Sequence, residues 1–174
     1  RLNQSAGVDM IAASANNYYG GELTQEEVEA YYTARTDAND PEPISYGLNS
    51  RLVKEADGTI REKVWKVGGL YSPAIEKIVY WLRKAESVAA EPQKSTIASL
   101  INYYETGDLR EFDRYNVMWV KDTLSNVDFV NGFIENYGDP LGRKASWEAN
   151  VNFLDKEACR RTQIISENAQ WFED

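Results

Sequence analysis

The sequence predicts an α+β fold that is mostly helical, with a small antiparallel β-sheet or partial β-barrel. Apolar residues recur at helical spacing over most of the chain, alternate strictly over 145–153, and flank an Asp57-Gly58 turn. The 174 residues are 43% hydrophobic and 27% charged, as in a globular protein, and suffice for one core. We therefore expect residues 1–174 to form one domain or part of one.

Two helices are predicted near the start of the chain. Residues 5–19 carry apolar side chains at helical spacing, and Gly20-Gly21 ends the pattern. Thr24 and Glu27 then form a capping box, in which each residue binds a free amide of the first helical turn. The second helix should run from this box to about Thr33.

Residues 44–67 are expected to form a β-hairpin. A loop with two prolines over 37–43 separates them from the preceding helix, because proline interrupts regular hydrogen bonding. Apolar and small residues alternate from Ile44, a second strand-like stretch runs over 60–67, and Asp57-Gly58 favours a tight turn between them.

Three further helices follow, each with its own boundary signal. Ser72-Pro73 starts the first, as N-cap and first helical residue, and Glu91-Pro92 lies near its end. Gly107 ends the second, and Asp108 caps the third. Because the connections are short, the three helices should pack as antiparallel neighbours.

The last part of the chain is predicted to be β and then α. Strands are expected near 126–137 and 145–153, joined by the turn Gly138-Asp-Pro-Leu-Gly142. A closing helix over 155–172 presents apolar residues on one face. We expect the two β regions of the chain to belong to one sheet, completed by strands of a larger protein.

The charge and the residue types present exclude several classes of function. Nineteen basic against 28 acidic residues give a net charge of −9, which argues against a nucleic acid or an anionic membrane as a partner. No apolar run approaches the roughly 20 residues of a membrane helix. The chain has no histidine and a single cysteine, Cys159, which excludes Ser-His-Asp and Cys-His catalysis, the common zinc sites and an internal disulfide.

The remaining patterns point to no complete catalytic site. Asp128 and Glu135 are seven residues apart, so on a regular strand they face opposite ways and cannot flank one glycosidic bond. The aromatic residues (5 Trp, 11 Tyr and 5 Phe) could line a sugar or peptide groove, but most lie on predicted core faces. No catalytic and no metal-binding residues are therefore assigned within this chain.

The stretch over 126–142, NVDFVNGFIENYGDPLG, resembles the lower-domain segment of the dipeptidyl peptidase III family, the M49 zinc exopeptidases. Further segments in the same order resemble bacterial members: ISYGLNSRL at 44–52, VWKVGG at 64–69, YETGD at 104–108, WVKD at 119–122 and NAQWFED at 168–174. The resemblance covers essentially the whole chain. No single segment is a catalytic signature, but the ordered set is specific.

The resemblance implies a two-lobed enzyme that removes dipeptides from peptide N-termini. In the family, the upper lobe holds zinc through an H-E-x-x-G-H motif and a second acidic motif, E-E-x-R-A, and neither occurs here. This chain would be a lower-lobe fragment of a bacterial member, inactive alone, with zinc only in the full-length parent. The family is typically cytosolic, which implies a cytoplasmic location.

The resemblance also implies a substrate site. In the family, the peptide adds as a strand to the lower-lobe sheet, and an acidic residue near the start of the matching strand holds the free amine. Asp128 occupies that position, and Phe129, Val130 and Asn131 would belong to the docking strand. Val130 stands where the family has a tyrosine, so one hydroxyl contact to the peptide is missing.

Two other functions stay open from the sequence. One is a non-catalytic domain that binds peptide or glycan through exposed aromatic residues, and the other is a purely structural helical domain. If the sheet is completed by other parts of a parent enzyme, its remaining lobe is a partner, and the isolated chain is expected to associate with itself through exposed sheet edges.

Overall fold

We describe the protein from a computed structural model that covers residues 1–174. The α+β class is confirmed. Six helices are present: α1 (Gln25–Thr33), α2 (Ser72–Glu86), α3 (Gln93–Thr106), α4 (Leu109–Lys121), α5 (Lys156–Glu167) and α6 (Ala169–Glu173). Five strands accompany them: β1 (Tyr19–Gly20), β2 (Ser50–Lys54), β3 (Ile60–Val64), β4 (Val127–Glu135) and β5 (Ser146–Phe153). None of the six helices combines the length and the apolar character that a bilayer-spanning helix requires.

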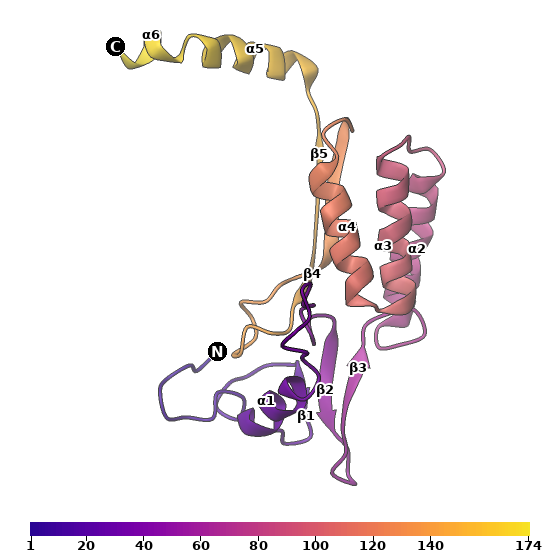
Figure 1. Ribbon diagram of the computed structural model, residues 1–174, viewed down its shortest axis with the longest axis vertical. Helices are drawn as coiled ribbons and strands as arrows, with labels where there is room; N and C mark the ends of the chain where they lie inside the picture. Colours follow the sequence, from indigo (N-terminus) through magenta and orange to yellow (C-terminus); the bar gives the residue numbers. More distant parts are fainter.

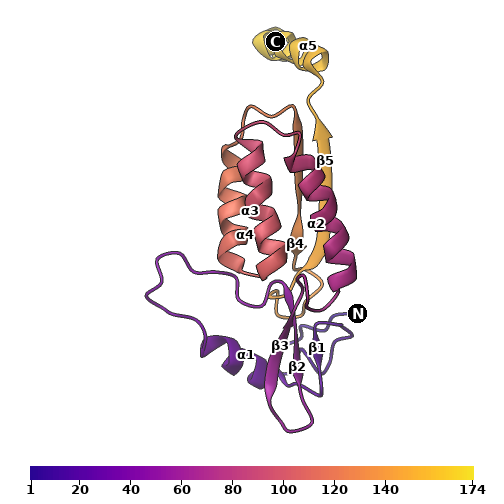
Figure 2. The same cartoon turned by 90° about the vertical axis from the view of Figure 1, so that its right-hand side faces the viewer.

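The molecule is elongated, with three parts arranged along its long axis (Figure 1). A small sheet and α1 lie at one end. The helices α2, α3 and α4 lie beside the long β4–β5 hairpin in the middle. Beyond the hairpin, α5 and α6 form an arm that projects from the other end, as Figure 2 also shows.

The β-strands form two sheets, not the one sheet or partial barrel that we expected. In the first sheet β2 pairs with β3 antiparallel and with the short β1 parallel. In the second, β4 pairs only with β5. One backbone hydrogen bond, from the Ala145 amide to the Leu48 carbonyl at 2.9 Å, links the regions that precede β5 and β2. The long loop over 136–145 keeps the sheets apart.

The predicted hairpin over 44–67 is shorter than expected. Its strands are β2 and β3, and residues 46–49 form a turn instead of a strand. The turn between the strands lies where predicted but is less tight: it is a five-residue loop over 55–59, in which Gly58 has a φ of +82°, which glycine adopts without strain, while Asp57 has no positive φ.

The three-helix unit follows the predicted boundaries closely. Gly107 ends α3 in the left-handed conformation, and Asp108 caps α4 by accepting a hydrogen bond from the Arg110 amide at 2.8 Å. At α2 the cap differs by one residue: Ser72 is already helical, and its hydroxyl accepts from the Gly68 amide. These helices supply most of the main core.

Residues 5–18 form turns, so the first predicted helix is wrong. Asp9 Oδ1 accepts hydrogen bonds from the Ile11 and Ala12 amides at 3.0 and 2.9 Å, and Asn16 Oδ1 accepts from the Tyr18 amide at 3.1 Å. Short polar side chains thus take the amides that a helix would use. The second helix is confirmed as α1, with both hydrogen bonds of its capping box formed.

The closing helix is present but has no partner. It breaks at Asn168 into α5 and α6, and neither helix has a buried residue. Its apolar side chains, including Ile165 and Trp171, are exposed.

Candidate functional site

The strand β4 carries all four residues that the resemblance assigned to peptide binding, and it separates them onto two faces. Asp128 points toward α4, where its Oδ1 accepts a hydrogen bond of 2.7 Å from the indole nitrogen of Trp119. Asn131 points toward α3, where its Oδ1 accepts one of 2.7 Å from the Tyr104 hydroxyl. Val130 lies two residues from Asp128 on the strand and so shares its face, and it lines the same cavity as Trp119.

A cavity of about 520 Å³ separates α4 from this face of the hairpin. We call it the α4–β4 groove. It is lined by Ser45, Leu48, Phe112, Asp113, Asn116, Trp119, Val130, Ile134, Glu135, Asn136 and Glu148. Three of these residues are acidic and none is basic. The groove is therefore suited to a ligand group that carries a positive charge.

Two carboxyl groups of the groove have raised pKa values. Burial raises the pKa of Asp113, and the nearby Asp108 adds to this while Arg110 opposes it. The pKa of Glu135 is also raised, because its carboxyl group shares a hydrogen bond with that of Glu148. A bound cation would favour the ionised form of these groups.

A bulge explains why Glu135 lies in the groove. The β4–β5 register shifts between Phe133 and Glu135, so that Ile134 and Glu135 both line the cavity. Counting residues on a regular strand had placed Glu135 on the face opposite Asp128, and that placement is wrong. No pattern in the sequence of this segment predicts the bulge.

Asp128 forms no ion pair with any residue of the chain. Its carboxylate is exposed, and Trp119 is its one side-chain partner. The contribution of Trp119 was missed from the sequence, where it looked like one more apolar residue of a helix. The available signal was its position in the last turn of α4, the helix that precedes the strand carrying Asp128.

The opposite face of the hairpin is held by a chain of hydrogen bonds. The indole nitrogen of Trp147 donates to the Tyr104 hydroxyl at 2.8 Å, and that hydroxyl donates in turn to Asn131. Phe129 packs against the main core. Asn131 and Phe129 thus fix the strand on the helices, while Val130 lines the groove and Asp128 contacts Trp119 beside it.

The outer edge of β4 is partly occupied by side chains. The carbonyl oxygen of Val127 accepts a hydrogen bond from Gln93, and that of Phe129 accepts one from the Tyr115 hydroxyl at 3.4 Å. A strand could pair with β4 here only by displacing these two donors. The outer edge of β5 has no such cover.

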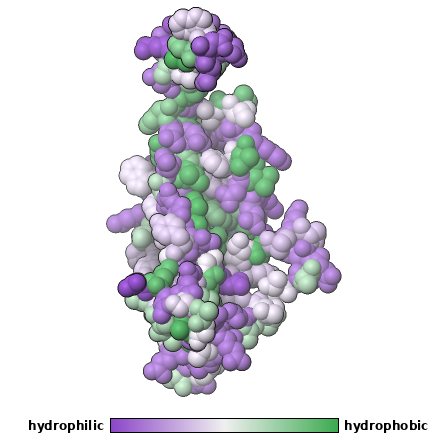
Figure 3. Space-filling model, turned by 90° about the vertical axis from the view of Figure 1, so that its left-hand side faces the viewer, coloured by the Kyte–Doolittle hydropathy of each residue, from purple (hydrophilic) through white to green (hydrophobic).

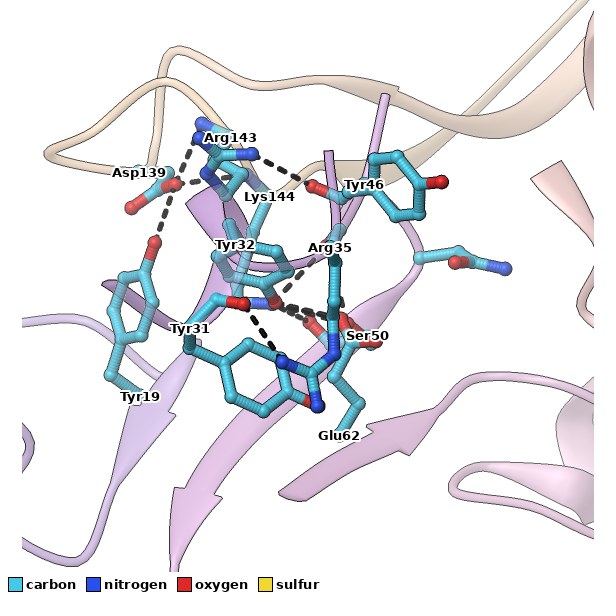
Figure 4. Close-up of polar contacts among 12 residues, drawn as sticks. Tyr19, Tyr31, Tyr32, Arg35, Tyr46, Ser50, Glu62, Asp139, Arg143 and Lys144 are labelled. Atoms are coloured by element: carbon cyan, nitrogen blue, oxygen red, sulfur yellow. Dashed lines mark hydrogen bonds and ion pairs between the residues drawn. The ribbon is translucent and has the colours of Figure 1, made fainter. Parts of the chain in front are cut away.

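The turn between β4 and β5 has a structural role. Asp139 is buried, and its Oδ2 accepts hydrogen bonds from the Tyr19 hydroxyl at 2.9 Å and from the amides of Arg143 and Lys144 at 2.8 Å each. The turn is thereby tied to β1 (Figure 4).

Lys144 joins the same turn to α1 and β2. Its side chain is completely buried, and its Nζ donates to the Tyr32 hydroxyl at 2.6 Å and to the Ser50 carbonyl and hydroxyl at 3.0 and 3.1 Å (Figure 4). A Glu62 carboxylate oxygen lies 4.0 Å away. Burial lowers the pKa of Lys144 to about 8, although Glu62 and Asp139 act in the opposite direction. Because no solvent reaches this ammonium, we interpret the cluster as a structural link.

The chain does not fit a zinc ion. It has no histidine, its one cysteine is exposed on α5, and no three His, Cys, Asp or Glu side chains come together in a way that could hold a metal. The acidic side chains of the groove are hard oxygen donors, whereas zinc sites in proteins draw mainly on nitrogen and sulfur. No chemical step is therefore assigned to a metal bound by these residues.

Comparison with known proteins gives consistent results. The family model of peptidase family M49 matches residues 45–172. The chain is 28% identical over 103 residues to dipeptidyl peptidase 3 of Rattus norvegicus, covering 59% of this chain and 14% of the rat protein. It is 30% identical over 107 residues to dipeptidyl peptidase 3 of Dictyostelium discoideum, covering 61% and 16%.

Two solved structures share the fold. Dipeptidyl-peptidase III from Corallococcus sp. strain EGB superposes with a TM-score of 0.63 at 20% identity, over 88% of this chain and 28% of that one. DPP III from Caldithrix abyssi gives 0.62 at 19%, with the same coverage. The chain thus spans less than a third of the length of each relative. With a family match over most of its residues, it belongs to peptidase family M49.

Proposed function

We propose that this chain is the peptide-binding, lower-lobe part of a zinc-dependent exopeptidase that removes dipeptides from peptide N-termini. Membership of family M49 and the similarity to proteins named dipeptidyl peptidase 3 support the activity. In this proposal residues 1–174 are a part-domain, the zinc lobe lies in the remainder of the parent enzyme, and the chain alone is inactive. A cytoplasmic location and a bacterial source belong to the same proposal.

One observation carries the assignment of the binding site. Asp128 presents an exposed carboxylate that no cation of the chain neutralises, beside a groove lined by three acidic residues and no basic one. A peptide N-terminus is a positively charged amine, and an ionised partner makes its hydrogen bonds stronger than neutral ones. We therefore place the substrate amine at Asp128, with the peptide running along the groove past Val130.

Trp119 would orient the amine-binding carboxylate. Its hydrogen bond occupies one oxygen of Asp128, so the other oxygen remains to accept from the ammonium group. Phe129 and Asn131 contribute by fixing the strand through the core and through Tyr104. Val130 offers only an apolar contact, so the peptide main chain gains no side-chain hydrogen bond at this position.

The test uses Asp128→Asn in the full-length parent, with a dipeptidyl-naphthylamide and its desamino analogue as substrates. Loss of a hydrogen bond between charged groups should lower kcat/KM for the free-amine substrate about 10- to 100-fold, through KM. The desamino analogue should be cleaved equally by both enzymes. Glu26→Gln, which neutralises an exposed carboxylate on α1, serves as the control. An equal loss of kcat/KM for both substrates would show that Asp128 does not bind the substrate amine.

A further inference from the structure

A second cavity, of about 640 Å³, lies between α2 and the β4–β5 hairpin. We call it the α2–β5 cavity. Of its eleven lining residues nine are hydrophobic and none is charged. Trp147 lines this cavity, whereas its neighbour Glu148 lines the α4–β4 groove, so the two cavities lie on opposite faces of the hairpin. Five aromatic side chains surround the α2–β5 cavity: Tyr18, Trp65, Tyr71, Phe133 and Trp147.

The apolar lining continues along both walls beyond the cavity. On α2, Ala74 and Ile78 line the cavity, and Trp81 follows on the same side of the helix, where it is 68% exposed. On β5, Val151 lies on the same face as Trp147 and is 58% exposed. Apolar residues that gather in this way on a surface mark a place where another molecule or segment binds.

The backbone of Tyr71, which lines the same cavity, is strained. Its φ is +64°, in the left-handed region that bulky side chains rarely adopt. Its side chain is 60% exposed, and its ring contacts that of Trp65 with 6.3 Å between the centroids. Such strain persists where the surrounding structure holds the residue in place. Contacts from an occupant of the cavity would hold Tyr71 further.

We propose that a segment of the parent enzyme outside residues 1–174 fills the α2–β5 cavity with large, uncharged side chains. The inference rests on the part of the proposed function that makes this chain a piece of a longer enzyme, as its coverage of the relatives indicates. The side chains must be uncharged because no lining residue could pair with a charge, and burying an unpaired charge is costly.

Other occupants fit the cavity less well. Small-molecule sites use polar groups to orient the ligand, but here the Ser146 hydroxyl already donates to the Glu135 carbonyl at 3.2 Å and the Trp147 indole to Tyr104. A second copy would bring another net charge of −9 to the contact. The α5–α6 arm projects from the far end of the hairpin (Figure 1). Figure 3 views the molecule from the side opposite to α2 and also shows the arm clear of the body.

Cysteine labelling of the full-length parent tests whether the cavity is filled. Ala74 lines the cavity, whereas Glu76 lies on the far side of α2, and both are exposed in this chain. In the parent, Ala74→Cys should react with N-ethylmaleimide at least about tenfold more slowly than Glu76→Cys, because labelling must await a local opening. In this chain the two should react at similar rates. Both positions fall in the tryptic peptide 67–77, which contains no other cysteine, so mass spectrometry reads each site directly.

The chemistry of the occupant is tested by Ala74→Asp. In this chain the new carboxylate lies in the first turn of α2, which an acidic residue stabilises, so the urea midpoint should stay constant or rise. In the parent the same carboxylate would be buried against apolar side chains, and the thermal midpoint should fall by about 3 °C or more.

The outcomes separate a filled cavity from an open one. Equal labelling of Ala74→Cys and Glu76→Cys in the parent would overturn the proposal. Equal protection of both would also overturn it, because the whole helix and not the cavity would then be covered. A parent that tolerates Ala74→Asp as well as this chain does would rule out an apolar occupant. Labelling needs no catalysis, so an inactive parent would refute the proposed function and leave this result intact.

Discussion

Raising the pH from 8 to 9.5 is expected to stabilise this protein, because Lys144 is buried with a lowered pKa. Burial lowers that pKa from 10.5 to about 8, and unfolding returns the side chain to water. Between these two values the unfolded chain binds more protons than the folded one. The free energy of unfolding must therefore rise with pH across this interval and level off near 10.5.

The size of the effect follows from the two pKa values of Lys144. The difference between about 8 and 10.5 corresponds to about 3 kcal/mol, at roughly 1.4 kcal/mol for each pH unit. A small part of this total rise in the free energy of unfolding is complete by pH 8, because half of the folded molecules have lost the Lys144 proton at that pH. Lys144 alone should then contribute roughly 1 to 2 kcal/mol between pH 8 and 9.5, and ionisation of tyrosines in the unfolded chain offsets part of this near pH 9.5.

The upper limit of the pH range is set by tyrosines. Burial raises the pKa of Tyr19 and of Tyr32 above 10, so these residues stay protonated in the folded protein when they ionise in the unfolded chain. Stability must fall above pH 10 for this reason. Tyrosine ionisation in the unfolded chain already begins at about pH 9, so the contribution of Lys144 is taken as the difference between the unmodified protein and Lys144→Met, which share these tyrosines.

The assay is urea denaturation followed by far-UV circular dichroism at half-unit pH steps. Lys144→Met should show no rise between pH 8 and 9.5, whatever its stability at pH 7. Lys54→Met, which removes a partly exposed lysine paired with Glu27, should keep the rise of the unmodified protein. If the stabilities of the unmodified protein and of Lys144→Met change in parallel over this range, the buried ammonium is not the cause.

Three further substitutions test local features by urea denaturation. Thr24→Ala removes a helix cap and should cost about 1 kcal/mol; an unchanged midpoint would show that the capping box is not stabilising. Gly47→Ala should cost more, about 1–3 kcal/mol, because its Cβ would lie 2.7 Å from the buried ring of Tyr32 at a φ of +93°. Gly58→Ala has a similar φ and open space, so a cost equal to that of Gly47→Ala would exclude the steric clash. Deletion of 155–174 should leave the midpoint unchanged, since the arm buries nothing, and a large loss would contradict its isolation.

Local signals in the sequence located most of the elements. The capping box at Thr24, the left-handed Gly107 and the cap at Asp108 are features of a few consecutive residues, and each is formed as predicted. The same reasoning failed over residues 5–18. There the apolar spacing is helical, but side chains such as Asp9 bind the local amides, and Ile11 packs in the smaller core without a helix.

Features that depend on distant contacts were not predictable. Lys144 stands in a polar turn and looks like a surface lysine, and only the approach of α1 and β2 encloses it. The separation of the two sheets depends on the path of the loop over 136–145, which no periodicity describes. At the candidate site, the family resemblance identified Asp128 from the sequence. The hydrogen bond from Trp119 to Asp128 and the bulge before Glu135 are visible only in the structure.

The most direct test of the central claim is hydrolysis of a dipeptidyl-naphthylamide by the full-length parent and by this chain. The account predicts that the parent releases naphthylamine, that a chelator abolishes the reaction and that added zinc restores it. It predicts no hydrolysis by residues 1–174, whose side chains offer no zinc site. A parent that is inactive, or active regardless of chelator, would contradict the account, as would hydrolysis by the chain alone.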